Sequence, residues 1–487
     1  MQTTAGCNRR CGLKSTGWSG WPDHLKSKAP VKVLFITGNF PPLSGGLNGG
    51  ALVALRVARS LVRSGVGCGV FNGETAQNFN GRLRKKVWNG MPTWSLSVGD
   101  SLLTPKGGET EVAAALLAVC REFEPDLIHV FQYECWHGQL GEALERTGAV
   151  PVVFTALDFG PFCARSTLVT GQGDICEGNP GREKCSSCLM SGRTPLIRWV
   201  RRASSLLPER AVDWPFVATV ARDAAGNRKR LGEALENWPA FLRVTRRWIA
   251  PSIAMSEKLR AHGVNPSAID HVPYGFDAAP ARSKKVHGGD IVFGYAGRPV
   301  YEKGFHLMTA AFARVAAVWP NVRLLLFVAK SELFRPYAAD ARRCLLPFEE
   351  RIEWGEFDGA DEKSIAVAHS KIHCMIVPSV WLDNLPLTVV ESLANGTPVI
   401  ASTHSSAAEP IQCGHNGLLF NWLEKGALAT QMERFVADAS LRENLLANAS
   451  YTRGYSDEAA SILKTYASCL QETGFATEPA RAPFRTE

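Results

Sequence analysis

Two carboxylates stand close together in an otherwise apolar stretch of the sequence, VWLDNLPLTVVESLANG. Asp383 follows a Trp-Leu pair, and Glu391 comes eight positions later. Carboxylates only accept hydrogen bonds, which suits them to the paired hydroxyls of a sugar or a ribose. Pro386 favours a helix start and Asn395-Gly396 a helix stop, so Asp383 is predicted in a loop and Glu391 one to two turns into a helix. Both acids can then face one cleft. The structural alternative is that Glu391 only caps this helix or pairs with an arginine.

The same loop offers backbone donors. The N–H groups from Asn384 through Leu385 to Leu387 precede the expected helix, where they have no intrahelical partner and are left for ligand oxygens.

Two cations follow a second expected strand, in the stretch GRPVYEKGFHLM. Gly297, Arg298 and Lys303 come directly after the β-rich run 291–296, at what would be its carboxyl end. Arginine supplies a planar fork and lysine a compact point charge, a combination that suits a diphosphate. The alternative is that both are ordinary solvated loop charges.

A glycine-rich loop, GNFPPLSGGLNGG, follows the first strand-like run, 31–37. It contains no G-x-G-x-x-G, and the chain has no G-x-x-x-x-G-K-[ST] phosphate loop, which weakens dehydrogenase and P-loop interpretations. Its paired glycines still allow a close backbone approach, and the start of the next helix favours an anion. These glycines are Gly45, Gly46, Gly49 and Gly50. A plain surface turn is the alternative.

Four cysteines gather within 26 residues and end in a C-x-x-C pair. They are Cys163, Cys176, Cys185 and Cys188. In a cytosolic chain such a cluster indicates a metal site more than a disulfide framework, and we expect a structural zinc with four thiolate ligands. An iron–sulfur cluster or four reduced thiols remain alternatives.

The elements that must hold these residues alternate along the chain between compact β-rich runs and amphipathic helices. This alternation predicts an α/β protein with parallel, doubly wound sheets. Two such series occur, which indicates two Rossmann-like domains with a cleft between them and ligands beyond the carboxyl ends of the strands. The expected strands are 31–37, 126–131, 151–157, 248–252, 271–277 and 291–296, followed by VRLLLFVA, RIEWGEF, HCMIVPS and TPVIAS.

The domain boundaries follow from breaks in this pattern. Residues 1–30 are expected to be a flexible tail, 31–277 the first domain with an insertion at about 162–238, and 278–455 the second domain. Residues 456–487 are expected to form a C-terminal helix and tail, with the helix crossing back to the first domain.

Composition narrows the class of partner. A formal charge of +8 over 487 residues fits anionic ligands, and no basic stripe interleaved with aromatics argues for nucleic acid. The first 30 residues lack the apolar core of a signal peptide, and no run is long enough to span a membrane, so we expect a cytoplasmic protein. Residues 193–210 could lie on an anionic membrane surface or be a solvated helix.

Together these pieces resemble the retaining glycosyltransferases of the two-Rossmann-domain (GT-B) type, in the large family 4 group of bacterial group 1 glycosyltransferases, with a four-cysteine insertion. The matching pieces span about 31–466: the early PP and GG, PDLIHV, APS, VPYGFD, GRPVYEKG, VPSVW, the acid pair, NGTPVIAS and GHNGLLF. The resemblance implies transfer of a hexose-like sugar from a nucleotide-diphosphate donor to a hydroxyl acceptor, a saccharide or a lipid-linked one, with retention and without a required metal.

The resemblance also implies roles for single residues. Arg298 and Lys303 would hold the diphosphate, Glu391 the ribose and Asp383 the transferred sugar, while the early glycines approach the donor phosphates or the acceptor. Three positions depart from the pattern. Asp383 stands where Glu is usual, Leu157-Asp158 where many members carry His, and Tyr274 where Asn is commoner. The alternatives are a nucleotide-sugar 2-epimerase-like enzyme and a non-catalytic sugar-nucleotide-binding protein.

Overall fold

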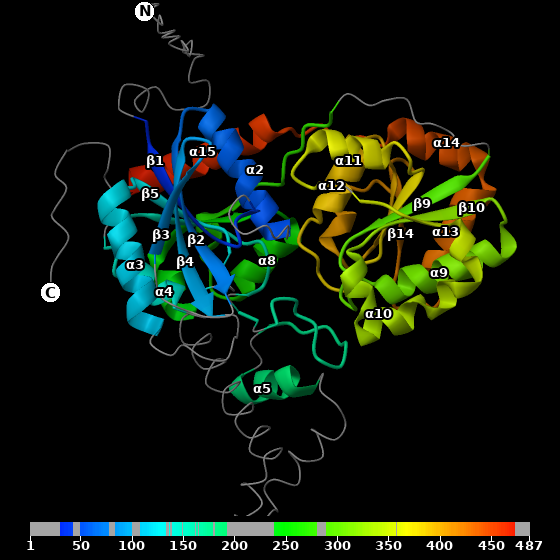
Figure 1. Ribbon diagram of the computed structural model, residues 1–487, viewed down its shortest axis with the longest axis horizontal. Coiled ribbons are helices and arrows are strands. Elements are labelled where there is room, and N and C mark those ends of the chain that lie inside the picture. The colour runs from blue at the N-terminus through cyan, green and yellow to red at the C-terminus, as the bar shows by residue number, and fades with distance from the viewer. Residues whose placement is uncertain are drawn as a thin grey trace, which may run out of the picture.

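The computed structural model describes most of the chain (Figure 1). The described residues are 30–41, 49–76, 83–99, 108–132, 136, 139–148, 150–160, 162–163, 165–178, 181–191, 238–279, 289–356 and 358–472. The predicted N-terminal tail and residues 193–210, which were considered for membrane contact, lie outside these ranges. No helix in the described ranges is long and apolar enough to cross a membrane.

The first domain is built on an eight-stranded sheet in the order β3-β4-β2-β1-β5-β6-β7-β8. Every neighbouring pair is parallel except the edge hairpin β3/β4. The strands are β1 (Lys32–Gly38), β2 (Gly67–Ala76), β3 (Leu83–Trp88), β4 (Met91–Gly99), β5 (Leu127–Val130), β6 (Val152–Thr155), β7 (Thr245–Ala250) and β8 (Ile269–His271).

Helices cover both faces of this sheet (Figure 1). They are α2 (Gly49–Arg63), α3 (Gly108–Phe123), α4 (Leu140–Glu145) and α8 (Ile253–Ala261). A further helix, α5 (Arg182–Ser191), lies away from the sheet, below it in Figure 1. α2 buries an unbroken series of side chains from Ala51 to Ala58, and Gly65, at a φ of +84°, follows its end. Left-handed glycine is a common helix stop, so Gly65 accounts for where α2 ends.

The second domain has a six-stranded sheet in the order β11-β10-β9-β12-β13-β14, parallel throughout. Its strands are β9 (Ile291–Ala296), β10 (Val322–Phe327), β11 (Ile352–Trp354), β12 (Cys374–Val377), β13 (Val399–Ser402) and β14 (Gly417–Phe420). Its α-helices are α9 (Phe305–Val318), α10 (Pro336–Ala341), α11 (Glu362–His369), α12 (Leu387–Ala394), α13 (Ala427–Ala437) and α14 (Ala439–Asn448). β9 and β12, the neighbouring central strands, carry the loops that hold the predicted cations and acids.

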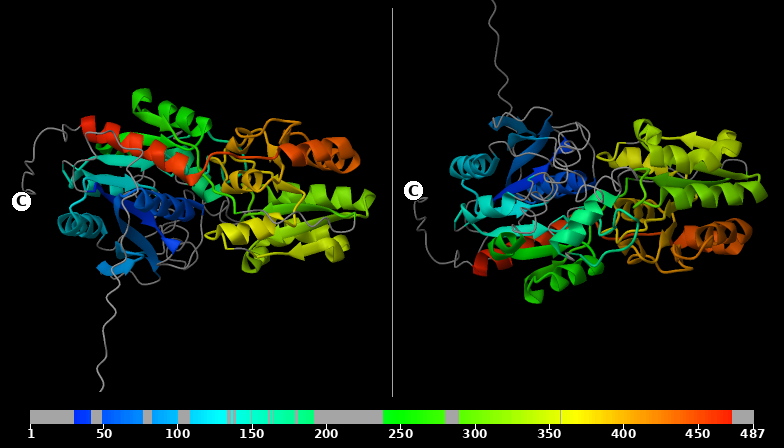
Figure 2. Two further views of the ribbon diagram at one scale, coloured as in Figure 1. Left: turned by 90° about the horizontal axis from the view of Figure 1, so that it is seen from above. Right: turned by 90° about the horizontal axis from the view of Figure 1, so that it is seen from below.

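The last helix, α15 (Tyr455–Glu472), lies against the first domain although it follows the second in sequence (Figure 2). Its buried side chains, among them Ile462 and Tyr466, share one apolar cluster with α2 and with β1 and β5. Two chain segments therefore run between the domains, and they touch: Phe276 N–H donates to Arg453 O at 3.0 Å. A Cβ on Gly275 would lie 2.1 Å from Gly454 O, so only glycine allows this crossing.

The two-domain architecture agrees with the local sequence patterns, and some single strands do not. Two parallel-sheet Rossmann-like domains are present as predicted. The predicted strand 271–277 is wrong beyond His271, because residues 272–279 leave the sheet as extended chain that crosses toward the second domain. Strand β2, the hairpin β3/β4 and strand β14 were not predicted.

Candidate functional site

Two loops at the carboxyl ends of β9 and β12 lie against each other and carry the predicted cations and one predicted acid. Val380 N–H donates to Glu302 O at 3.0 Å, which ties the loops together. A Cβ on Gly304, which has a φ of +65°, would lie 1.9 Å from Pro378 O. Any other residue at position 304 would force the loops apart, so the glycine after Lys303 sets the geometry of the site.

Lys303 and Asp383 form an ion pair between these loops. Lys303 Nζ lies 2.5 Å from Asp383 Oδ2, and the hydroxyl of Ser379 donates to the same oxygen at 2.9 Å. The Lys303 ammonium also lies 5.3 Å from the centre of the Trp381 ring. The Asp383 side chain is 7% exposed and that of Lys303 26% exposed, so a buried carboxylate fixes a lysine whose outer face remains accessible.

Arg298 is exposed and makes no ion pair with any described residue. Its carbonyl accepts a hydrogen bond of 2.9 Å from the hydroxyl of Tyr295, which fixes the backbone while the guanidinium extends from the loop. An unpaired guanidinium at the carboxyl end of a strand is available to an anionic ligand.

Glu391 lies in α12 as predicted, but its carboxylate is already paired. Arg56 Nη2 on α2 of the first domain lies 2.6 Å from Glu391 Oε1, and the side chains are 5% and 7% exposed. Arg56 Nη2 also donates to Gly359 O at 2.8 Å. The structural alternative in which Glu391 pairs with an arginine therefore describes this structure, and the two acids of the opening stretch face different partners.

Asn384 and Leu385 join the domains in this structure. The hydroxyl of Ser252 donates to Asn384 Oδ1 at 2.6 Å, and Asn384 Nδ2 donates to Ala156 O at 2.6 Å. Leu385, at a φ of +45°, is buried in the cluster shared with α2 and α15. A left-handed leucine is strained, and the surrounding packing holds it.

The glycines of the first loop divide into two groups. Gly45 and Gly46 lie outside the described residues. Gly49 and Gly50 open α2, and a Cβ on Gly50 would lie 2.8 Å from Gln132 Nε2, which is a close approach between this helix start and the end of β5.

The cysteine-bearing segment touches the loop that carries the cations. Arg165 lies 3.6 Å from Glu302, and a Cβ on Gly173 would lie 2.8 Å from the hydroxyl of Tyr301. The predicted insertion thus borders the site from the first domain.

The four predicted ligand cysteines are near one another. Burial raises the pKa of the Cys185 thiol to about 11, and the neighbouring thiols of Cys163, Cys176 and Cys188 add to the rise. Gly178 N–H donates to Cys176 Sγ at 3.5 Å. In the described residues, however, no group of three or more His, Cys, Asp or Glu side chains is arranged so that it could hold a metal ion. Zinc stays a prediction.

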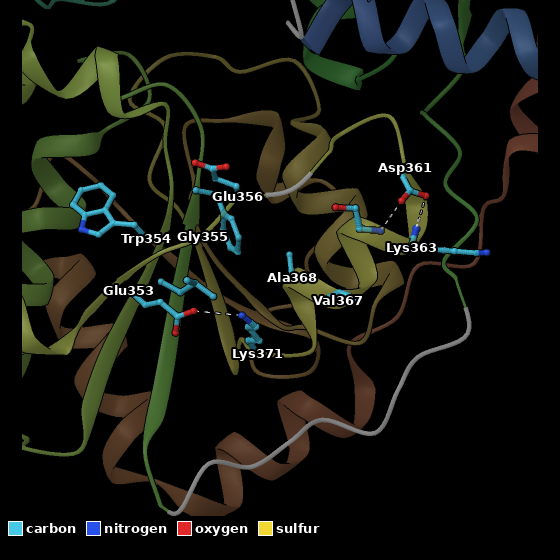
Figure 3. A pocket seen from close by; sticks show the side chains of 12 residues that line it. Glu353, Trp354, Gly355, Glu356, Asp361, Lys363, Val367, Ala368 and Lys371 are labelled. Carbon is cyan, nitrogen blue, oxygen red and sulfur yellow. Dashed lines mark hydrogen bonds and ion pairs between the residues drawn. The ribbon is translucent and has the colours of Figure 1, made fainter.

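A separate pocket of about 510 Å³ lies between β10, β11 and α11 (Figure 3). Lys371 and Glu353 form an ion pair of 3.3 Å at one side, and Asp361 caps the start of α11 at the other. None of the predicted site residues lines it.

Two buried groups at the domain crossing are electrostatically unusual. Burial raises the pKa of Glu458 to about 7, although Gly275 N–H donates to its carboxylate at 2.9 Å. Burial also raises the pKa of Tyr274 well above its usual value, and the carboxylates of Glu458, Asp383 and Asp158 add to the rise. These groups surround the point where the chain passes from one domain to the other.

Sequence reasoning missed Arg56, Ser379 and Trp381. Trp381 lies within the stretch quoted for the acid pair and Ser379 directly precedes it, so both could have been assigned by their closeness to Asp383. Arg56 appeared in the sequence as one of several arginines on the polar face of a helix, and nothing local separates it from Arg59 or Arg63.

The fold is that of GT-B glycosyltransferases. Three solved structures with this architecture illustrate the likeness. Anabaena Alr3699/HepE in complex with UDP has a TM-score of 0.58 at 16% identity, covering 90% of this chain and 100% of that chain. Sucrose-phosphate synthase from Thermosynechococcus elongatus has 0.57 at 18%, covering 91% and 98%. The catalytic domain of Arabidopsis thaliana starch synthase IV, bound to ADP and acarbose, has 0.58 at 11%, covering 91% and 100%.

A family model matches part of the chain, within the second domain. Residues 278–451 match the model of the family described as glycosyl transferases group 1. A search of curated proteins gives no match. The matched segment contains both acids and both cations of the site described above.

Proposed function

We propose that this protein transfers a hexose-like sugar from a nucleotide-diphosphate donor to a hydroxyl acceptor with retention of configuration. The observation that carries the proposal is the Lys303–Asp383 pair beside the exposed Arg298, inside a segment that matches group 1 glycosyltransferases. The pair supports a donor site because its lysine keeps one accessible face next to an unpaired guanidinium, as a diphosphate requires.

Each residue of the candidate site has its own role in the proposed transfer. Arg298 and Lys303 bind the donor diphosphate and stabilise the negative charge that grows on the leaving phosphate. Asp383 orients Lys303 and accepts from hydroxyls of the transferred sugar, and Glu391 accepts from the ribose. The backbone at Gly297, Asn384 and Leu385 lines the donor, and Gly49 and Gly50, with Gly45 and Gly46, approach its phosphates or the acceptor.

The bond changes balance without a metal or a protein base. The bond between the anomeric carbon and the diphosphate oxygen breaks, and a bond to the acceptor oxygen forms on the same face. The acceptor proton passes to the departing phosphate, which leaves as a nucleoside diphosphate. The protein's part is to align the partners and exclude water between the domains.

The acceptor side belongs to the first domain. We propose a saccharide or lipid-linked acceptor and a place in polysaccharide or glycoconjugate biosynthesis, in the cytoplasm or at the inner face of the membrane. The solved neighbours support a range of glycan products, since their titles name sucrose-phosphate synthase, starch synthase IV and proteins of lipopolysaccharide biosynthesis.

The test is donor turnover. UDP-, ADP- and GDP-linked hexoses are each incubated with the protein and a set of saccharide acceptors, and release of nucleoside diphosphate is measured. We expect release with one donor, and a product whose anomeric configuration by NMR equals that of the donor. Inversion would contradict the retaining mechanism. Binding without release in every mixture would favour the non-catalytic alternative, and conversion of the donor to its 2-epimer would favour the epimerase-like one.

We also propose that Cys163, Cys176, Cys185 and Cys188 hold a structural zinc. Their mutual closeness supports this, together with the Gly178 N–H bond to Cys176 Sγ, because backbone N–H groups favour thiolate. Freshly purified protein should contain about one zinc per chain, and chelation should lower its melting temperature while leaving a Cys185→Ser variant unaffected. Zinc and iron contents near zero would refute the proposal.

A further inference from the structure

Arg56 is a first-domain residue whose side chain reaches into the second domain. It belongs to α2, and its guanidinium contacts both Glu391 of α12 and Gly359 in the loop that precedes α11. Its neighbour on the helix, Arg59, donates to Ala360 O at 3.2 Å in the same loop but does not contact Glu391. Two arginines of one helix therefore hold one loop, and only Arg56 holds the carboxylate.

The environment of Arg56 is energetically unfavourable for a residue that serves only the stability of the fold. Nη2 donates to both Glu391 Oε1 and Gly359 O, whereas Nε and Nη1 are buried without a hydrogen-bond partner among the described residues. The guanidinium carbon lies 5.2 Å from the centre of the Phe276 ring, which offers some compensation. Buried donors without partners are costly, and ion pairs of this kind are often no more stable than apolar replacements. Stability alone therefore does not account for this arrangement.

The ion pair with Arg56 uses only one of the two carboxylate oxygens of Glu391. Its Oε1 is fixed by Arg56, while no described residue hydrogen-bonds to Oε2. Asn395 Nδ2 donates to the backbone carbonyl of Glu391 at 2.8 Å, so the residue is anchored at both its backbone and one carboxylate oxygen. A carboxylate held in this way keeps its charge and presents one oxygen in a fixed direction, which is the requirement for recognising a hydroxyl.

We propose that Arg56 is a positioning residue for the donor nucleotide: it fixes the carboxylate of Glu391 from the opposite domain so that Oε2 accepts a hydrogen bond from the ribose. This inference rests on the proposed function, which assigns the ribose to Glu391. It adds that the first domain, expected to bind the acceptor, also completes the donor site. Ribose recognition then depends on the contact between α2 and α12, so a rotation that separates the domains weakens it.

The experiment measures ribose recognition directly. The probe is whichever of UDP, ADP and GDP raises the melting temperature most, and its 2′,3′-dideoxy form is the comparison. Dissociation constants for both are measured by calorimetry with wild-type protein and with the Glu391→Gln, Arg56→Met, Arg56→Lys and Arg59→Met variants. Arg59→Met is the matched control, since it removes a cation of the same helix and a bond to the same loop but no contact with Glu391.

We expect the wild type to prefer the ribose form by roughly tenfold, the value of one good hydrogen bond to a charged group. Glu391→Gln and Arg56→Met should both lose this preference, and combining them should cause no further loss because they act on one contact. Arg56→Lys should recover part of it, and Arg59→Met should keep it. In turnover, Arg56→Met should raise the donor KM more than it lowers kcat.

Different failures are distinguishable. If Glu391→Gln keeps the preference, the ribose assignment in the proposed function is wrong and the inference falls with it. If Glu391→Gln loses the preference and Arg56→Met keeps or increases it, the assignment stands and Arg56 is a competitor or a structural residue, which overturns the inference. If Arg56→Met does not fold, Arg56→Lys carries the same test, since an unchanged preference in that variant together with an unchanged KM contradicts a role for the planar guanidinium.

Discussion

The two acids of the stretch 383–391 are alike in burial and different in their partners. Asp383 pairs with Lys303, a residue of its own domain, through loops tied by a backbone hydrogen bond. Glu391 pairs with Arg56 of the opposite domain. Movement between the domains leaves the first pair intact and breaks the second. The phosphate end of the proposed donor site is therefore preformed, whereas the ribose end is assembled when the domains meet.

The largest expected effect falls on the preformed pair. Lys303→Ala should fold, because its side chain is partly exposed, but should lower kcat by about 2–4 kcal/mol of transition-state stabilisation, or roughly 30- to 1,000-fold. Steady-state turnover with saturating donor measures this. Lys371→Ala, which removes an exposed lysine from the pocket beside α11, is the control. Equal turnover in the two variants would mean that Lys303 is a surface charge.

Removing the Glu391 carboxylate from its pair with Arg56 should lower kcat less than Lys303→Ala does, but should clearly weaken nucleotide binding. Glu391→Gln keeps the shape and leaves Arg56 buried without its counter-charge, so we expect about 1–3 kcal/mol lower stability as well as weaker nucleoside diphosphate binding. Thermal unfolding with and without the nucleotide separates these two changes. An unchanged melting temperature together with unchanged affinity would show that the pair matters for neither.

The stability of the domain crossing, where Glu458 is buried, should depend on pH. Burial raises the folded-state pKa of Glu458 to about 7, above the 4.5 of a solvated glutamate, so the folded protein keeps a proton that the unfolded chain releases. This contribution to stability is present in full below about pH 4.5 and is lost as the pH rises to about 7, by about 1–3 kcal/mol.

Melting temperatures measured at several pH values test this contribution of Glu458. Between pH 5 and 7.5 the melting temperature of the wild type should fall further than that of Glu458→Gln, whose side chain is neutral throughout. Parallel curves for the two proteins would contradict the assignment of a buried neutral carboxyl to Glu458.

The smallest effect is expected at the surface. Lys371→Ala breaks an ion pair whose side chains are 49% and 64% exposed, and pairs of this kind contribute about 0–1 kcal/mol. Its unfolding free energy should therefore match the wild type within about 0.5 kcal/mol, a scale against which the buried pairs are judged.

Sequence patterns predicted the elements near the site because those signals are local. The strands before Gly297 and before Asp383 are compact β-branched runs, and Pro386 and Asn395-Gly396 bound α12 where they were expected to. The hairpin β3/β4 was missed because LRKKVW carries three basic residues and reads as solvated chain. Strand β14 has four residues, like the predicted β12 and β13, but its run GLLF has no β-branched residue that would indicate a strand.

The partners of the acids could not be predicted because they are set by tertiary contacts. Arg56 and Glu391 are 335 positions apart, and Lys303 and Asp383 are 80 apart. Local spacing placed each side chain at the correct end of its strand or helix. The partner of each charged side chain depends on how distant segments pack together. The periodicity within one segment carries no information about that packing.

The central claim is that Lys303, held by Asp383, stabilises the leaving diphosphate of a nucleotide sugar. The most direct measurement is release of nucleoside diphosphate from the preferred donor by the wild type and by Lys303→Ala, at saturating donor and acceptor. The account predicts release by the wild type and a rate at least about 30-fold lower in the variant, with the fold preserved. Equal rates in the two proteins, or no release from any donor by the wild type, would contradict it.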